Sequence, residues 1–212
     1  MREYITLVVT EFQQNARIVF SEADKSAVVI DPGGDVPRIL REIKSRNLNV
    51  EQIWLTHSHI DHCGGVNKLK LETGAKLFGH QEESFMREGL LSIADMYGLS
   101  RQDYENCPEP DVYISGGETL SFAGADFQVL YTPGHSPGHL CFYSVEDNTL
   151  IAGDTLFFQS IGRTDLPGGD HSTLINSIKE KIFSLPNETK VLSGHGPDTT
   201  VGFEKDNNPF LS

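Results

Sequence analysis

The segment Thr56–His62 constrains this chain more than any other stretch of its sequence. It reads Thr-His-Ser-His-Ile-Asp-His and directly follows the apolar run Ile53–Leu55, so three imidazoles and a carboxylate lie within a few positions of one another. Neutral imidazole and carboxylate groups are good ligands for zinc, iron or manganese. Polar groups crowded in this way are costly to bury, and a bound cation satisfies all of them. The segment therefore predicts a metal site rather than a solvated histidine-rich turn.

Other ligand-type residues follow hydrophobic runs later in the chain, and each is flanked by glycine or proline. A strand that ends at such a turn can deliver a side chain to a site while the backbone turns away. These residues are candidates for the same metal site. They are His135, Asp154 and His195.

The hydrophobic pattern predicts strands in two groups with helices among them, which is the pattern of a single α/β domain. The expected strands are 5–9, 17–20, 27–30, 53–55, 76–78, 127–131, 140–143, 150–151 and 190–192. The expected helices are 36–46, 65–72 and 173–183, with Asp35 and Ser172 in the N-cap positions of the first and the last. In segment 81–109, apolar residues at helical spacing favour helices packed on the core over a lid.

Charge and cysteine content narrow the classes of partner. A net charge of −13 argues against nucleic acid and anionic membranes, both of which need basic patches. No stretch is long and apolar enough for a membrane span, and the N-terminus looks like a first strand rather than a signal peptide. The odd number of cysteines, 3, favours reduced thiols and a cytoplasmic location. We interpret Cys63, which follows the histidine segment, as a small buried residue rather than a sulfur ligand.

The order of these motifs resembles the metallo-β-lactamase-fold superfamily over essentially the whole chain. The histidine segment, the later lone histidine, the Gly153-Asp154 pair and the Gly194-His195 pair follow one another as they do in that family. The resemblance implies a four-layered αβ/βα sandwich that holds two metal ions. The first ion would be held by His57, His59 and His135. The second would be held by Asp61, His62 and His195, and Asp154 would bridge the two ions.

Further stretches resemble the small single-domain glyoxalase II-like hydrolases of the YcbL type. Position 154 is an aspartate, which can bridge two metals, where many β-lactamases have cysteine. The stretches 160–171, 193–197 and 208–211 are also similar to that group. We expect one domain over residues 1–212 without the C-terminal helical domain that grips glutathione in full-length glyoxalase II enzymes. Glutathione specificity is therefore left open.

This resemblance implies a thioester hydrolase that acts on a small molecule such as S-D-lactoylglutathione. A hydroxide shared by the two metals would attack the carbonyl carbon, and the thiolate would leave. We expect zinc, with iron and manganese as alternatives, because the ligands suit all three metals. Asp61 and Asp154 are the predicted catalytic residues as well as ligands. The oligomeric state is left open.

Three residues outside the ligand set have two interpretations each. Arg163, in a glycine-flanked loop, is the candidate for binding an anionic substrate group, and the alternative is a surface ion pair with Asp165. Asp31 either accepts a hydrogen bond from a ligand imidazole or simply begins a turn before Pro32. His139 is interpreted as a structural histidine rather than a partner of the metal site.

Other functions of the same fold compete with the thioester hydrolase. A mononuclear iron persulfide dioxygenase would use His57, His135 and Asp154 as a facial triad. A lactonase or another ester hydrolase would use the same chemistry on a different substrate. A non-catalytic relative is disfavoured because such proteins normally lose ligands, and none of the predicted ligands is missing here.

Overall fold

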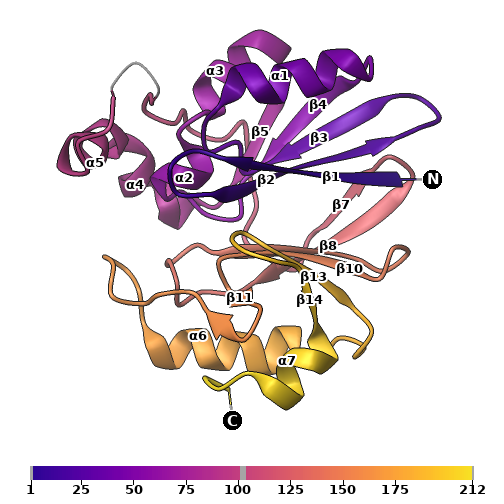
Figure 1. Ribbon diagram of the computed structural model, residues 1–212, viewed down its shortest axis with the longest axis vertical. Helices are drawn as coiled ribbons and strands as arrows, with labels where there is room; N and C mark the ends of the chain where they lie inside the picture. Colours follow the sequence, from indigo (N-terminus) through magenta and orange to yellow (C-terminus); the bar gives the residue numbers. More distant parts are fainter. Residues whose placement is uncertain (1, 101–103, 212) are drawn as a thin grey trace. The chain divides into compact units, whose positions relative to one another are not determined.

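The computed structural model describes residues 2–100 and 104–211, which fall into two compact units, Met1–Tyr113 and Ile114–Ser212. Each unit contains a six-stranded sheet, and in each the helices cover one face of that sheet (Figure 1). Within the described residues, no helix is long and apolar enough to cross a membrane.

The sheet of the first unit has the strand order β1-β2-β3-β4-β5-β6. The pairs β1–β2 and β2–β3 are antiparallel, whereas the pairs β3–β4, β4–β5 and β5–β6 are parallel. Parallel neighbours need crossover connections, and helices α1 and α3 supply two of them. The strands are β1 (Arg2–Val9), β2 (Gln14–Ser21), β3 (Ser26–Ile30), β4 (Asn49–Trp54), β5 (Lys76–Gly79) and β6 (Val112–Tyr113). The helices are α1 (Val36–Ser45), α2 (Ile60–Cys63), α3 (Val66–Thr73), η1 (Gln81–Glu83), α4 (Ser84–Glu88) and α5 (Leu90–Met96).

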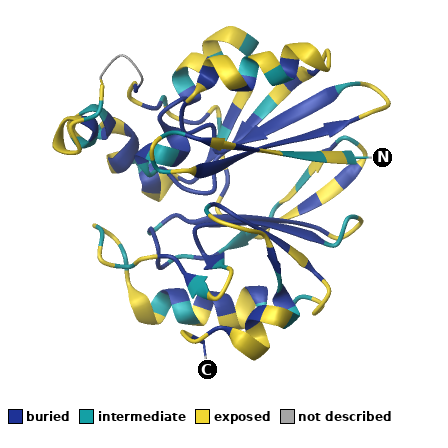
Figure 2. Cartoon of the chain, in the orientation of Figure 1, coloured by how far each residue is buried: buried dark blue, intermediate teal, exposed yellow. Residues whose placement is uncertain are grey.

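The core of the first unit forms where alternate strand residues meet the apolar stripes of the helices. Ile18 and Val29 point from neighbouring strands into the same cluster as Ile39 of α1. Every residue of β2 and β3 is buried (Figure 2). This rigid sheet fixes the point at which β4 ends and the histidine segment begins.

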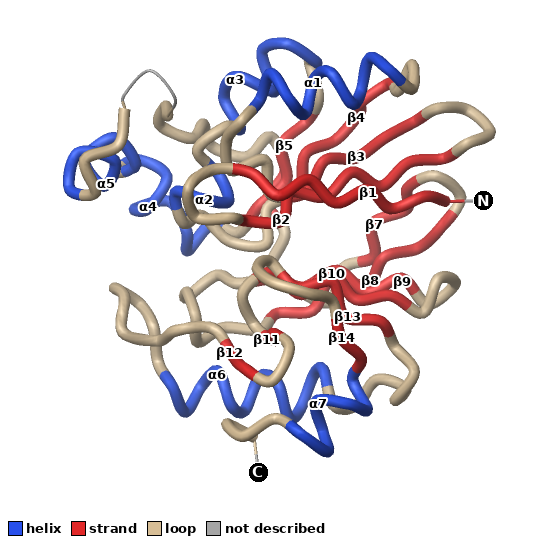
Figure 3. The backbone as a smooth tube through the Cα atoms, viewed as in Figure 1, coloured by secondary structure: helices blue, strands red, loops and turns tan. Residues whose placement is uncertain are grey.

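The sheet of the second unit has the order β14-β13-β10-β9-β8-β7 (Figure 3). Only the β10–β13 pair is parallel, and the ends of these two strands lead into Asp154 and His195. The strands are β7 (Thr119–Phe122), β8 (Ala125–Tyr131), β9 (Leu140–Ser144), β10 (Thr149–Gly153), β13 (Lys190–Ser193) and β14 (Thr199–Thr200), with a separate ribbon of β11 (Leu156–Phe157) and β12 (Ser160–Ile161). The helices are α6 (His171–Ser177), its continuation η2 (Ile178–Ile182) and α7 (Val201–Asn207).

Most of the expected strands and helices are confirmed, and the errors concern their ends and several short elements. Ser172 is not the N-cap of α6: the helix begins at His171, and the Asp170 carboxylate accepts a hydrogen bond from the backbone N–H of Thr173. The Asp35 position is correct, but its carboxylate accepts from the backbone N–H of Thr10 rather than from the helix. The strands β6, β7, β11, β12 and β14 and the helices α2 and α7 were not predicted. Four of these strands have two residues each, which is too few to show a periodicity.

Residues 81–96 of segment 81–109 form the expected helices on the core, and residues 101–103 lie outside the described residues. Leu90 and Ala94 of α5 are fully buried in the cluster of the first unit. The helical spacing of apolar residues therefore indicated core packing correctly.

Candidate metal centre

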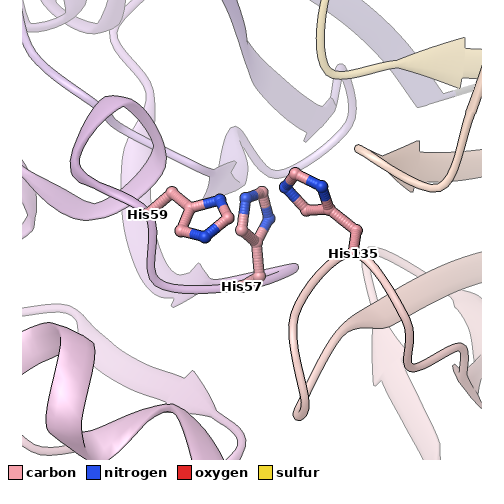
Figure 4. A group of neighbouring side chains, drawn as sticks. All are labelled: His57, His59 and His135. Carbon is pink, nitrogen blue, oxygen red and sulfur yellow. The ribbon is translucent and has the colours of Figure 1, made fainter. Parts of the chain in front are cut away.

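The histidine segment is a tight turn between strand β4 and helix α2. His57 and His62 are buried, and their ring centroids lie 4.0 Å apart. The ring of His59 meets that of His57 edge to face with centroids 4.7 Å apart (Figure 4). Asp61, on the first turn of α2, has its Oδ2 atom 3.7 Å from Nε2 of His62. The first unit therefore gathers its predicted ligands within one small region.

Asp31, at the end of β3, is the hub of the hydrogen bonds that orient this region. Its carboxylate accepts from the backbone N–H of Thr56 at 2.8 Å and from the Thr56 hydroxyl at 2.6 Å. It also lies 3.0 Å from Nδ1 of His62. The residue has a φ of 51°, a left-handed conformation that aspartate tolerates better than most residues. The interpretation of Asp31 as an acceptor for an imidazole N–H agrees with this geometry.

These hydrogen bonds indicate which ring nitrogen carries the proton in two of the histidines. The Asp31 carboxylate can only accept, so Nδ1 of His62 is the donor. The Thr56 hydroxyl donates its hydrogen to Asp31 and can then accept from Nδ1 of His57 at 3.0 Å. Both rings thus carry their proton on Nδ1 and their lone pair on Nε2, which is the form in which imidazole binds a metal.

Cys63 is a buried thiol in this region. Its Sγ donates to the backbone carbonyl of Ser58 at 3.3 Å. Burial raises the pKa of this thiol well above its usual range, so it stays protonated. Its burial and its hydrogen bond to the loop backbone agree with the interpretation as a small buried residue.

In the second unit, one carboxylate oxygen lies at almost equal distances from two imidazoles. Oδ2 of Asp154 is 3.6 Å from Nε2 of His135 and 3.5 Å from Nε2 of His195. Asp154 and His135 are buried, while the side chain of His195 keeps 26% of its surface exposed. An oxygen placed in this way could serve two cations at once, each of which would also take one imidazole.

The backbone of the second unit orients both His135 and Asp154. Nδ1 of His135, which also appears in Figure 4, donates to the backbone carbonyl of Arg163 at 2.8 Å and so directs Nε2 toward Asp154. The backbone N–H of Asp154 donates to Nε2 of His139 at 3.1 Å. His139 is fully buried, and its Nδ1 lies 3.1 Å from the Thr155 hydroxyl. The structural interpretation of His139 therefore holds, and the structure it supports is the turn that carries Asp154.

Arg163 contributes its backbone to this region while its side chain points to solvent. The guanidinium makes two hydrogen bonds to the Asp165 carboxylate, at 2.7 and 2.8 Å, and both side chains are more than half exposed. These hydrogen bonds lower the pKa of Asp165 to about 2. The geometry agrees with the ion-pair interpretation, and the role of Arg163 in binding an anionic substrate stays a prediction.

Comparisons with known proteins identify the family. The family model for the metallo-beta-lactamase superfamily matches residues 9–195. The chain is 40% identical to the hydroxyacylglutathione hydrolase GloC of Haemophilus influenzae, over 96% of this chain and 95% of that protein. The chain belongs to the metallo-β-lactamase superfamily.

Two solved structures of the metallo-β-lactamase superfamily show the same fold over nearly the whole chain. The BLEG-1 B3 metallo-beta-lactamase superposes with a TM-score of 0.91 and is 37% identical in sequence. The alignment covers 99% of this chain and 100% of the BLEG-1 chain. The protein TTHA1623, solved in a di-iron-bound form, superposes with a TM-score of 0.88 and is 38% identical in sequence. The alignment covers 98% of this chain and 100% of the TTHA1623 chain. The expected fold class is therefore confirmed, and the chain is a metallo-hydrolase of this superfamily.

The donor set fits a pair of divalent cations. Each unit assembles its own predicted ligands, with imidazole lone pairs at Nε2 in His57, His62 and His135 and a carboxylate oxygen beside two further imidazole nitrogens. That the two groups of ligands together hold two metals stays a prediction. Sequence reasoning missed Thr56, which gives no signal of its own because its role depends on Asp31, far away in the sequence.

Gly194 leaves the space that the Asp154 carboxylate occupies. A Cβ atom at this position would lie 2.2 Å from Oδ1 of Asp154, far inside van der Waals contact. We expect Gly194→Ala to displace the carboxylate and to weaken metal binding about tenfold or more, as measured by zinc titration against a chromophoric chelator. Gly79→Ala is the control, because its Cβ would meet nothing nearer than a Pro110 side-chain atom at 3.2 Å. Wild-type zinc affinity in Gly194→Ala would contradict the placement of Asp154 at the metal.

Proposed function

We propose that this chain is a binuclear metal-dependent hydrolase of thioesters. The observation that carries the proposal is the position of Asp154 Oδ2 between two imidazole nitrogens, at 3.6 and 3.5 Å. A carboxylate oxygen so placed suits a bridge between two metals. A relative of 40% identity named hydroxyacylglutathione hydrolase and a di-iron-bound relative of 38% identity support the same interpretation.

The proposed assignment of ligands follows the family pattern. Asp154 would be a ligand of both cations. The other ligands would be His57, His59 and His135 for the first cation and Asp61, His62 and His195 for the second. When bound, two such cations supply a nucleophile from water at neutral pH and stabilise negative charge on a carbonyl oxygen.

The chain's own residues prepare this site for the reaction. Asp31 and Thr56 keep the Nδ1 protons of His62 and His57 in place, so that both rings offer Nε2 without a change of tautomer. The Arg163 carbonyl does the same for His135. These partners hold the ligands before substrate arrives, which lowers the cost of organising the site during reaction.

A thioester suits such a site because its leaving group makes little demand on the protein. A thiol has a pKa near 8.5, so a thiolate departs readily near neutral pH without a strong proton donor. Amide and phosphate ester substrates need more help from a general acid.

A β-lactam is the second candidate substrate, because the BLEG-1 B3 metallo-beta-lactamase is 37% identical and has the same fold. It would use the same ligands, with a ring amide in place of the thioester. The two candidates differ in the group that leaves, so a comparison of rates on the two substrates separates them.

The test combines elemental analysis with turnover on one preparation. We expect two metal ions per chain, hydrolysis of S-D-lactoylglutathione, and loss of both metal and activity after chelation with restoration by zinc, iron or manganese. His59→Ala should lose turnover while it keeps its circular dichroism spectrum. One iron per chain with oxygen uptake on a persulfide would overturn the proposal in favour of a dioxygenase. Faster turnover of a β-lactam or a lactone would overturn the thioester assignment.

A further inference from the structure

Two charged side chains from segment 81–109 are buried against the loop that carries His57 and His59. Glu83, at the end of η1, is 1% exposed, and Arg87, on α4, is fully buried. Their spacing of four residues places them on the same side of a helical turn. Burying a carboxylate and a guanidinium is costly, so such groups are kept where they make strong interactions.

Both side chains contact Ser58, the residue between the two predicted ligands. Oε2 of Glu83 accepts from the backbone N–H of Ser58 at 2.8 Å. Nη1 of Arg87 lies 3.3 Å from the Ser58 hydroxyl and donates to the backbone carbonyl of His80 at 3.0 Å. One loop residue is thus held through its backbone and through its side chain.

The Arg87 guanidinium is also held by a second carboxylate, that of Glu109. The guanidinium donates to both carboxylate oxygens of Glu109, at 3.4 and 2.8 Å. The hydrogen bonds from Arg87 lower the pKa of Glu109, so this carboxylate is ionised at neutral pH. The Tyr113 hydroxyl donates to the same carboxylate at 2.7 Å. Arg87 therefore lies in a fixed position from which it can restrain the loop.

We propose that Glu83 and Arg87 are positioning residues that hold the His57-Ser58-His59 loop in the conformation that binds metal. This inference rests on the proposed function, because it takes His57 and His59 to be ligands. It gives segment 81–109 a role in the site: its helices pack on the core and carry two buried charges to the ligand loop. His57 and His59 are separated by one residue, so a fixed backbone at Ser58 lowers the entropic cost of bringing both imidazoles to one cation.

The experiment measures metal binding rather than activity. Zinc affinity is determined by competition with a chromophoric chelator, and the visible spectrum is recorded on the cobalt-loaded protein. We expect Glu83→Ala to weaken zinc binding about 10- to 100-fold and to change the cobalt spectrum. Glu83→Gln keeps an oxygen that can accept from Ser58 N–H, so it should recover most of the affinity.

Glu204→Ala is the matched control. Glu204 is also fully buried and accepts a hydrogen bond from a backbone N–H, that of Gln159 at 3.0 Å, in a loop without predicted ligands. It should lower the melting temperature but leave zinc affinity and the cobalt spectrum unchanged. An equal loss of zinc affinity in Glu204→Ala and Glu83→Ala would overturn the inference, because the effect would then be general destabilisation.

Two further variants test the positioning role where Glu83→Ala alone would not. If Glu83→Ala does not fold, Ser58→Ala tests the inference in its place. Loss of the hydroxyl beside Arg87 should weaken zinc binding roughly fivefold, and wild-type affinity would overturn the inference.

His57→Ala separates the inference from the proposed function. If His57→Ala loses zinc but folded Glu83→Ala does not, only the positioning role fails. If His57→Ala binds zinc like the wild type, the ligand assignment fails and the positioning role fails with it.

Discussion

Asp154→Ala should lower turnover about a thousandfold or more and reduce the metal content from two ions to at most one per chain. Stabilisation of reaction charge by metals contributes several kcal/mol, and each ~1.4 kcal/mol corresponds to a factor of ten in rate. The Asp154 carboxylate lies beside two imidazoles, so its loss should affect both cations together. The measurement is kcat on a thioester, together with elemental analysis.

Asp126→Ala is the control for this result. Asp126 is an exposed carboxylate on β8 in the same unit, and it accepts a hydrogen bond from the Ser121 hydroxyl. It should keep wild-type turnover and both metals, since removing an exposed carboxylate changes little. Two metals and wild-type turnover in Asp154→Ala would refute the proposed bridge.

Asp31→Ala should destabilise the protein and weaken metal binding at the same time. Its carboxylate accepts from Thr56 N–H, from the Thr56 hydroxyl and from His62 Nδ1, and it is 3% exposed. Buried donors left without an acceptor cost about 1–3 kcal/mol each, so we expect a loss of roughly 3 kcal/mol or more in the free energy of unfolding. That corresponds to roughly 6–12 °C in melting temperature for a chain of this size. Zinc affinity should fall about 10- to 100-fold.

Asp35→Ala separates the hydrogen bonds of Asp31 from its backbone conformation. Asp35 has a φ of 49°, close to the 51° of Asp31, but it is exposed and its carboxylate accepts from one backbone N–H, that of Thr10. Alanine at either position would have the same unfavourable left-handed backbone conformation. The excess loss in Asp31→Ala, measured by denaturant unfolding and zinc titration, should therefore come from the carboxylate. Equal losses in the two variants would show that the backbone alone matters.

The sequence predicted most of the regular structure because packing in this chain follows simple periodicity. Val36, Ile39 and Ile43 share one face of α1, as their spacing required. The apolar runs Ile18–Phe20 of β2 and Ala27–Ile30 of β3 are fully buried, as their composition required. The two-residue strands β6, β11, β12 and β14 could not be predicted from the sequence. A pair of residues has no periodicity of its own and becomes a strand only through its neighbours in the sheet.

The sequence alone determined the types and the order of the predicted ligands. The His57–His62 segment, His135, Asp154 and His195 were candidates there because imidazole and carboxylate are the ligand groups that such metals prefer, and their order resembles the family pattern. Only the tertiary structure decided what orients them. Asp31 reaches Thr56 and His62, Glu83 reaches Ser58, and His139 reaches the backbone of Asp154, each across a gap in the sequence that no local pattern spans. The physical reason is that ligand chemistry belongs to single residues, whereas a hydrogen bond that fixes a tautomer or a turn depends on two chain segments brought together by folding.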